Sequence, residues 1–273
     1  MARMDRDGVG LAYERVGAGL PTLLLIHGAF ADRSAYDLQV ERFAATHDIV
    51  RVDLRGHGES DPAPGPYSVA LFADDVAFMA RELGVHGSVV VGHSLGGLVA
   101  AEMAGRHRDV VGSVITLDSP SLIPGWTDRF AHPIDDRMED ADFRDVLEGF
   151  LRRARHPADD QERWSRNMAS VRRMPDDVVR ATWRALEWDP VTALRALAVP
   201  FLYLDHGQPG YDLTEVRRLC PQVASGQTVG AGHWALQDVP EQVNAMIDRF
   251  ITHGEVLAAY ERGRSEGASE AQG

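Results

Sequence analysis

Residues 88–100 have the sequence SVVVGHSLGGLVA, and this stretch decides the fold. The run at 88–91 is largely apolar and β-branched, which predicts a strand covered on both faces, as in a parallel sheet. Gly92, Ser94 and Gly96 follow as a G-x-S-x-G pattern, and a helix-forming segment comes next. Glycines on both sides of the serine allow a sharp strand-to-helix turn. We therefore expect the Ser94 hydroxyl to project from the carboxyl edge of the sheet.

The same alternation of strand and helix continues on both sides of this stretch. Segments between the apolar runs, such as 67–84, carry apolar residues at spacings of three and four, which predicts amphipathic helices. The apolar runs predict further strands at residues 22–26, 48–54, 113–117 and 201–204. Strands and helices that alternate in this way predict an α/β fold with an open, doubly wound, mostly parallel sheet.

One long segment, residues 120–195, breaks this rhythm. It contains no convincing strand, and helical periodicity occupies residues 140–155, 159–173 and 175–188. We expect this segment to form a helical cap that is inserted before the late strands. Its arginines, Arg153 and Arg173 among them, alternate with acidic residues, which is typical of solvated helix faces.

The remaining residues are assigned to the core and to a tail. We expect residues 1–119 and 196–254 to form the core, with a final amphipathic helix at 240–251. Residues 255–273 are expected to begin with a short helix and to continue as a polar, partly disordered tail.

Composition and charge exclude several classes of protein. A chain of 273 residues that is 44% hydrophobic fits one large globular domain with an inserted lobe. The single cysteine, Cys220, excludes an internal disulfide, and we expect a reducing, cytoplasmic location. A net charge of −13 disfavours nucleic acid and anionic membrane surfaces as partners. The apolar runs are shorter than the ~20 residues of a membrane span, and the first residues lack a secretory signal.

A histidine is the natural general base for a serine hydroxyl, because its unperturbed pKa lies near neutrality. Eleven histidines are present, and His233, in the glycine-flanked segment GAGHW before the last helix, is the preferred candidate. Of the others, His57 lies in an expected turn, His93 is expected to point away from the serine, and His206 follows a strand closely. His27 is expected to be structural.

Two backbone N–H groups are candidates for an oxyanion hole. One belongs to Leu95, at the start of the helix after Ser94, and the other to Ala29, after the His27-Gly28 turn. The sequence shows no metal-ligand spacing and no phosphate-binding glycine loop, so we expect neither a metal nor a cofactor.

Taken together, these motifs resemble the α/β-hydrolase fold superfamily over about residues 8–252. The motifs that carry the resemblance are HGAF, DLRGHGESD, VGHSLGG and GAGHWALQDVPEQVNAMIDRF. The resemblance implies an eight-stranded core sheet, a helical cap and a Ser–acid–His triad, as in a serine esterase or lactonase. It supports Ser94 as nucleophile and His233 as base. Dehalogenases and epoxide hydrolases of this superfamily mostly carry Asp at the nucleophile position, so Ser94 argues against both.

The triad acid departs from the usual pattern of the superfamily. That pattern, P-x-L-x-x-x-G-x-x-D, begins here at Pro200 and places Pro209 where Asp is usual. Asp205 lies early and Asp212 lies late for this role. A minority arrangement places the acid after the preceding strand, where this chain has Asp118 in a context similar to some haloalkane dehalogenases. All three aspartates stay open as candidates, because the chemistry needs only a carboxylate that reaches Nδ1 of the base.

These observations predict a serine hydrolase that cleaves a small or medium carboxylic ester or lactone through an acyl-enzyme intermediate. The alternatives are a C–C bond hydrolase, a thioesterase or a cofactor-free perhydrolase on the same triad, and a non-catalytic ligand receptor with this fold. The expected partner is a small-molecule substrate. The identity of its acyl and alcohol parts, the pathway and the oligomeric state, a homodimer included, are left open.

Overall fold

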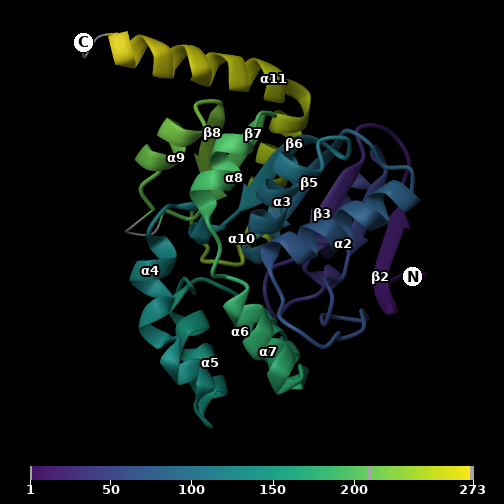
Figure 1. The fold of residues 1–273 in the computed structure, drawn as a ribbon. Helices are drawn as coiled ribbons and strands as arrows, with labels where there is room; N and C mark the ends of the chain where they lie inside the picture. Colours follow the sequence, from purple (N-terminus) through teal and green to yellow (C-terminus); the bar gives the residue numbers. More distant parts are fainter. Residues whose placement is uncertain (1, 208–210, 271–273) are drawn as a thin grey trace.

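The computed structural model describes residues 2–207 and 211–270 and contains one eight-stranded sheet (Figure 1). The strands follow the order β1-β2-β4-β3-β5-β6-β7-β8. Strand β2 is antiparallel to both β1 and β4, and all pairs from β4 to β8 are parallel. The strands are β1 (Ala2–Arg6), β2 (Val9–Val16), β3 (Leu23–Ile26), β4 (Ile49–Val52), β5 (Ser88–His93), β6 (Val111–Leu117), β7 (Phe201–Asp205) and β8 (Val223–Gln227). The predicted α/β fold, with a mostly parallel eight-stranded sheet, is confirmed.

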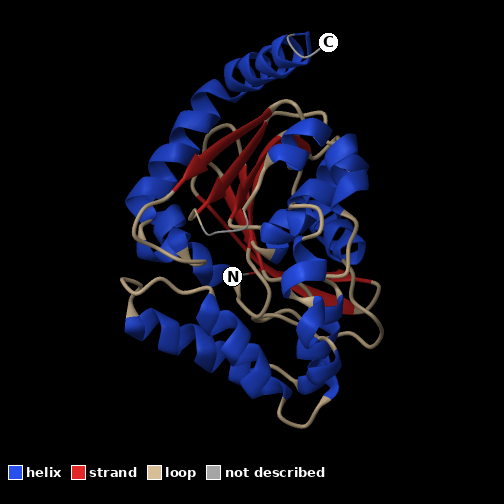
Figure 2. Cartoon of the chain, turned by 90° about the vertical axis from the view of Figure 1, so that its left-hand side faces the viewer, coloured by secondary structure: helices blue, strands red, loops and turns tan. Residues whose placement is uncertain are grey.

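The central strands are apolar throughout because helices cover both faces of the sheet (Figure 2). In β3, Leu24 and Ile26 pack on one face, whereas Leu23 and Leu25 pack on the other. The first face is covered by α2 (Val69–Glu82), α3 (Leu95–Arg106), α8 (Pro190–Ala196) and α9 (Thr214–Leu219). The second face is covered by α1 (Asp37–Phe43), α10 (Ala235–Asp238) and α11 (Pro240–Glu270).

The segment between β6 and β7 is helical, and in Figure 1 its helices α4 to α7 gather at one end of the molecule. Helices α5, α6 and α7 lie where the sequence predicts them. The helices before α8 are η2 (Pro120–Leu122), α4 (Trp126–Phe130), η3 (His132–Ile134), η4 (Asp136–Glu139), α5 (Phe143–Arg153), α6 (Gln161–Arg173) and α7 (Asp176–Arg184). They share an apolar cluster of their own, built around Leu147, Trp164, Met168 and Trp183. We treat the division into core and cap as a proposal.

Three strands, several short helices and the full length of α11 were not predicted. Strands β1 and β2 form a hairpin at the sheet edge, where half-exposed positions replace the continuous apolar runs of the centre. Their turn residues, Asp7 and Gly8, have φ angles of 56° and 83°, as a two-residue hairpin turn requires. Strand β8, at the other edge, is also partly polar. Helix α11 extends to Glu270, beyond the end expected at residue 251, and the partly disordered tail stays a prediction.

Among the described residues, no helix is both long enough and apolar enough to cross a lipid bilayer.

Candidate active site

Ser94 lies in the sharp turn between β5 and α3, with φ 52° and ψ −117°. This backbone conformation is strained for a residue with a side chain and is typical of functional turns. A Cβ on Gly92 would collide with the Gly96 backbone, and one on Gly96 would collide with the Ile26 carbonyl, so both positions require glycine. The turn therefore holds Ser94 half-buried at the carboxyl edge of the sheet, as the sequence predicts.

His233 lies in the loop between β8 and α10 and is held there from several sides. Its N–H donates to the Ala154 carbonyl at 2.8 Å, and its carbonyl accepts a bond of 2.8 Å from Nε2–H of His93. The preceding Gly232 N–H donates to Asp159 Oδ1 at 2.9 Å. Ala154 and Asp159 both belong to the segment between α5 and α6, so the helical region helps to fix the imidazole.

Asp118 is the candidate acid that contacts His233. Its carboxylate is buried at the end of β6, and its Oδ2 accepts a close hydrogen bond from Nδ1–H of His233. Burial alone would raise the pKa of Asp118, but hydrogen bonds from His206 and His233 hold that pKa well below its ordinary value. The carboxylate is therefore ionised and fixes the tautomer in which His233 Nε2 is free to take a proton.

The two alternative acids have other partners. Asp205 Oδ1 accepts a bond of 2.7 Å from the Gly207 N–H, and burial raises the pKa of its carboxyl. Asp212 is exposed, and its Oδ1 accepts a bond of 2.9 Å from the Thr214 N–H at the start of α9. Pro209, which occupies the position where the superfamily usually has Asp, lies outside the described residues.

Ala29 and Leu95 line the same cavity as Ser94. Within the described chain, neither of their N–H groups donates to a backbone carbonyl, so both are available to an oxyanion. His27 is structural: its Nδ1–H donates to the Gly28 carbonyl at 2.7 Å, and its Nε2 accepts from the Leu54 N–H at 3.0 Å. Burial lowers the pKa of His27, which keeps the ring neutral.

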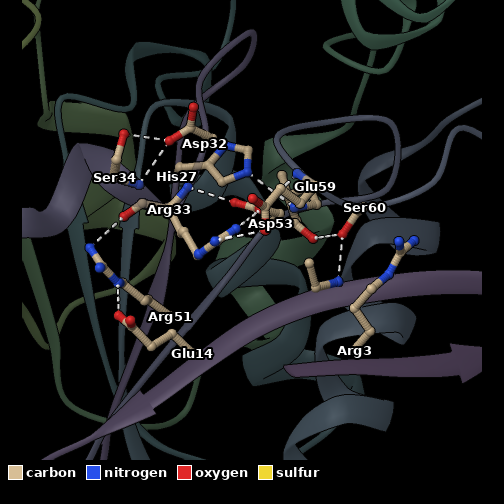
Figure 3. A network of polar contacts seen from close by, with 12 residues as sticks. Arg3, Glu14, His27, Asp32, Arg33, Ser34, Arg51, Asp53, Glu59 and Ser60 are labelled. Carbon is tan, nitrogen blue, oxygen red and sulfur yellow. Dashed lines mark hydrogen bonds and ion pairs between the residues drawn. The ribbon is translucent and has the colours of Figure 1, made fainter. Parts of the chain in front are cut away.

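A buried polar network fixes the loop that carries Ala29 (Figure 3). Asp53, which is fully buried, accepts hydrogen bonds from the Arg33 N–H at 2.7 Å and the Glu59 N–H at 2.9 Å, and it pairs closely with the Arg33 guanidinium. The loop after β3 and the loop after β4 are thereby joined beneath the oxyanion candidates.

Ser94 and His233 line one cavity of about 790 Å³ between the sheet edge and the cap helices. Its walls include the apolar residues Phe30, Leu98, Trp126, Phe150 and Trp183. Helix α6 contributes a polar stripe, spaced three and four residues apart, that consists of Arg163, Arg166, Asn167, Ser170 and Arg173. Arg153 of α5 lines the same cavity. The sequence suggests that Arg153 and Arg173 lie on solvated helix faces, but in the structure both also line this cavity.

One group of side chains has a spacing that suits a metal ion. His132, Asp135 and Glu187 have potential ligand atoms within 4.8 Å of one another. None of these three residues lines the cavity of Ser94. We assign no role to this group in the chemistry of the cavity.

Comparison with known proteins identifies the family and the fold. The model of a family described as "Alpha/beta hydrolase family" matches residues 23–246. The chain is 39% identical, over 100 residues, to the dihydrolipoyllysine-residue acetyltransferase component of the acetoin cleaving system of Cupriavidus necator, which covers 37% of this chain and 27% of that protein. It is 32% identical, over 116 residues, to 2-(acetamidomethylene)succinate hydrolase of Mesorhizobium japonicum, which covers 42% and 41%. These matches thus span less than half of either relative.

Solved structures agree along nearly the whole chain. A thermophilic esterase from Thermogutta terrifontis superposes with a TM-score of 0.78 at 25% identity, covering 92% of this chain and 98% of the esterase.

Proposed function

The chain belongs to the alpha/beta hydrolase family, and from this premise we propose that it is a serine hydrolase that cleaves a small or medium carboxylic ester or lactone. The proposal rests on one arrangement: Ser94 and His233 line the same cavity, and Asp118 accepts a hydrogen bond from His233. The names of two similar proteins, an esterase and a 2-(acetamidomethylene)succinate hydrolase, support hydrolysis as the reaction.

In the proposed mechanism, Nε2 of His233 takes the proton of the Ser94 hydroxyl while Oγ attacks the substrate carbonyl. The N–H groups of Ala29 and Leu95 bind the oxyanion, and Asp118 stabilises the imidazolium. The imidazolium then gives its proton to the leaving alkoxide, which leaves an acyl group on Ser94. Water, activated by the same imidazole, hydrolyses this acyl-enzyme and restores the serine.

The same triad suits C–C bond hydrolysis, thioester hydrolysis and cofactor-free perhydrolysis, because a fold does not fix a reaction. A non-catalytic ligand receptor is the remaining alternative. A panel of esters, lactones, thioesters and β-diketones, with the esters assayed both with and without hydrogen peroxide, separates the enzymatic reactions from one another. A cytoplasmic location and a homodimer stay predictions.

Covalent labelling tests whether Ser94 is an activated nucleophile. A fluorophosphonate is expected to add one phosphonyl group to the folded protein, and peptide mapping is expected to find it on Ser94, because His233 activates that hydroxyl alone. Ser94→Ala should abolish labelling, whereas Ser165→Ala, which removes an exposed hydroxyl on α6 outside the cavity, should retain it. Unchanged mass of the folded, unsubstituted protein would favour the receptor.

The charges that line the cavity favour a substrate that carries a negative charge. Arg163 forms an ion pair with Asp238 at 3.2 Å, and among the described residues Arg166 pairs only with the exposed Glu162 at 3.4 Å. Arg153 and Arg173 have no carboxylate partner within the described parts of the chain. The cationic residues of the lining thus outnumber its carboxylates, which are Asp32 and Asp37, although the whole chain has a net charge of −13.

This charge distribution predicts a substrate preference. An aryl ester with a terminal carboxylate is expected to show a kcat/KM about three- to tenfold above that of a neutral ester of equal length, as exposed ion pairs allow. The double variant Arg166→Gln, Arg173→Gln should lose this preference, mainly through KM. High salt should weaken the preference as well.

A matched control for this test is Arg172→Gln. Arg172 also belongs to α6, but it pairs closely with Glu148 and does not line the cavity. This variant is expected to keep the preference for the charged ester. The charge assignment would be refuted if the double variant slowed both esters equally. It would also be refuted if the unsubstituted protein preferred the neutral ester.

A further inference from the structure

Asp118 binds two imidazoles rather than one. While Oδ2 accepts from His233, Oδ1 accepts a bond of 2.7 Å from Nδ1 of His206, and the hydroxyl of Tyr211 lies 3.4 Å from Oδ2. An ionised carboxylate can only accept hydrogen bonds, so both histidines present Nδ1–H to it. The register of β6 and β7, which pairs Leu117 with Leu204, brings residue 206 next to residue 118.

His206 is shielded from solvent at this position. Its side chain is 4% exposed, and its ring meets that of Tyr211 edge to face at 5.4 Å. Its Nε2 has no hydrogen-bond partner among the residues that the structure describes. The contact with Asp118 is therefore the polar interaction that holds this ring in place.

We propose that His206 is a positioning residue of the triad, which ties Oδ1 of Asp118 so that Oδ2 stays directed at His233. This inference rests on the proposed function of Ser94, His233 and Asp118. His206 does not touch the reacting atoms and acts only through the carboxylate.

A buried carboxylate requires a hydrogen-bond donor on each of its oxygens. Asp118 has a φ angle of 44°, so its backbone is itself strained, and its own N–H donates to the Leu204 carbonyl at 2.7 Å. Without His206, Oδ1 would be a buried charged oxygen that lacks a donor, which is costly. The carboxylate would turn or take up water, and the hydrogen bond to His233 would lose its alignment. Donors on both oxygens fix the carboxylate plane, whereas donors on Oδ2 alone would leave it free to rotate.

The charge of His206 adds a dependence on pH. The groups that face it are Asp118 on β6, Asp205 on β7, Asp159 from the segment between α5 and α6, Tyr211, and His233 beyond the shared carboxylate. Burial opposes protonation, but the hydrogen bond and charge of Asp118, with Asp205 and Asp159, raise the pKa of His206 above its ordinary value. A protonated His206 places a positive charge on the carboxylate that also binds His233, and this charge opposes the imidazolium that His233 becomes during catalysis.

Two substitutions separate the hydrogen bond from the charge. In His206→Asn, the amide nitrogen can replace Nδ1 as donor without a charge. We expect kcat to stay within about tenfold of the starting protein and the acid limb of the pH–rate profile to move to higher pH, because the repulsion is gone. His206→Leu removes the donor as well, and its kcat should fall by about ten- to hundredfold, with little change in KM.

His86→Asn is the matched control, because His86 is exposed and lies outside the cavity. It should change neither kcat nor the pH profile. A His206→Leu variant within twofold of the starting protein over the whole pH range would overturn the proposal. So would a His206→Asn variant that loses as much activity as the leucine variant.

NMR of the Ser94→Ala protein tests the pairing without activity. Two strongly downfield imidazole protons are expected, one from each histidine on Asp118. Adding His206→Asn should remove one of them, and adding Asp118→Asn should remove both. This test does not need the His206→Leu variant, so it holds even if that variant fails to fold. The inference is refuted if the Ser94→Ala protein shows a single downfield signal and this signal remains after His206→Asn is added. Both signals in a protein that hydrolyses none of the substrates would instead refute the proposed function and leave the pairing intact.

Discussion

Ser94→Ala is expected to reduce kcat for an activated aryl ester by about 10⁴-fold or more, since loss of the nucleophile removes the acyl-enzyme route altogether. The substitution deletes one oxygen and leaves the glycines of the turn in place, so the fold should persist. Steady-state hydrolysis of an aryl acetate, with circular dichroism to confirm folding, measures the effect. The residual rate reports what the oxyanion donors and binding contribute without the serine.

Ser165→Ala is the control for this measurement, because Ser165 is exposed on α6 and, among the described residues, its hydroxyl bonds only within that helix. It should retain full activity. A Ser94→Ala protein with the turnover of the starting protein would show that another group carries out the reaction.

Asp118→Asn is expected to lower kcat by about 10³- to 10⁴-fold. The amide can present an N–H to His233 where the ring needs an acceptor, and this stabilises the tautomer that cannot take the serine proton. The amide also lacks the charge that offsets the imidazolium in the transition state. The effect should appear in kcat, with KM changed little, in assays at a pH above the acid limb.

The other two candidate acids serve as controls for Asp118. Asp205→Asn can keep the hydrogen bond from the Gly207 N–H, and Asp212→Asn lies at the exposed start of α9. Both variants are expected to stay within about tenfold of the starting protein, because neither side chain bonds to His233. If Asp205→Asn proves more damaging than Asp118→Asn, the acid has been assigned to the wrong strand.

The sequence predicts the centre of the sheet well, because strands buried on both faces must be apolar at every position. Leu23–Ile26 is such a strand, and its alternate residues enter two different apolar clusters. At the edges this rule fails: the hairpin of β1 and β2 is half-exposed and only its Asp7-Gly8 turn gives a local signal. Helix α11 shows the same limit, because its last turns are polar and give no pattern from which their helical form could be predicted.

The candidate site is predictable to the extent that local motifs define it. Ser94 and His233 both lie in glycine-flanked turns that can be recognised from neighbouring residues. The acid could not be chosen in this way, because its contact with His233 spans 115 positions of the chain and depends on which strand ends lie side by side. The pairing of His206 with Asp118 depends on the same strand register.

Two hydrogen bonds attach the His233 loop to the segment between α5 and α6, and they affect how a substrate can enter. The Ala154 carbonyl holds the His233 N–H, and Asp159 holds the Gly232 N–H, both from the segment that joins α5 to α6. Any movement that lifts this segment from the sheet breaks both bonds and leaves the His233 loop held by His93 and Asp118. Entry of a large substrate and alignment of the imidazole are thus coupled through this one segment.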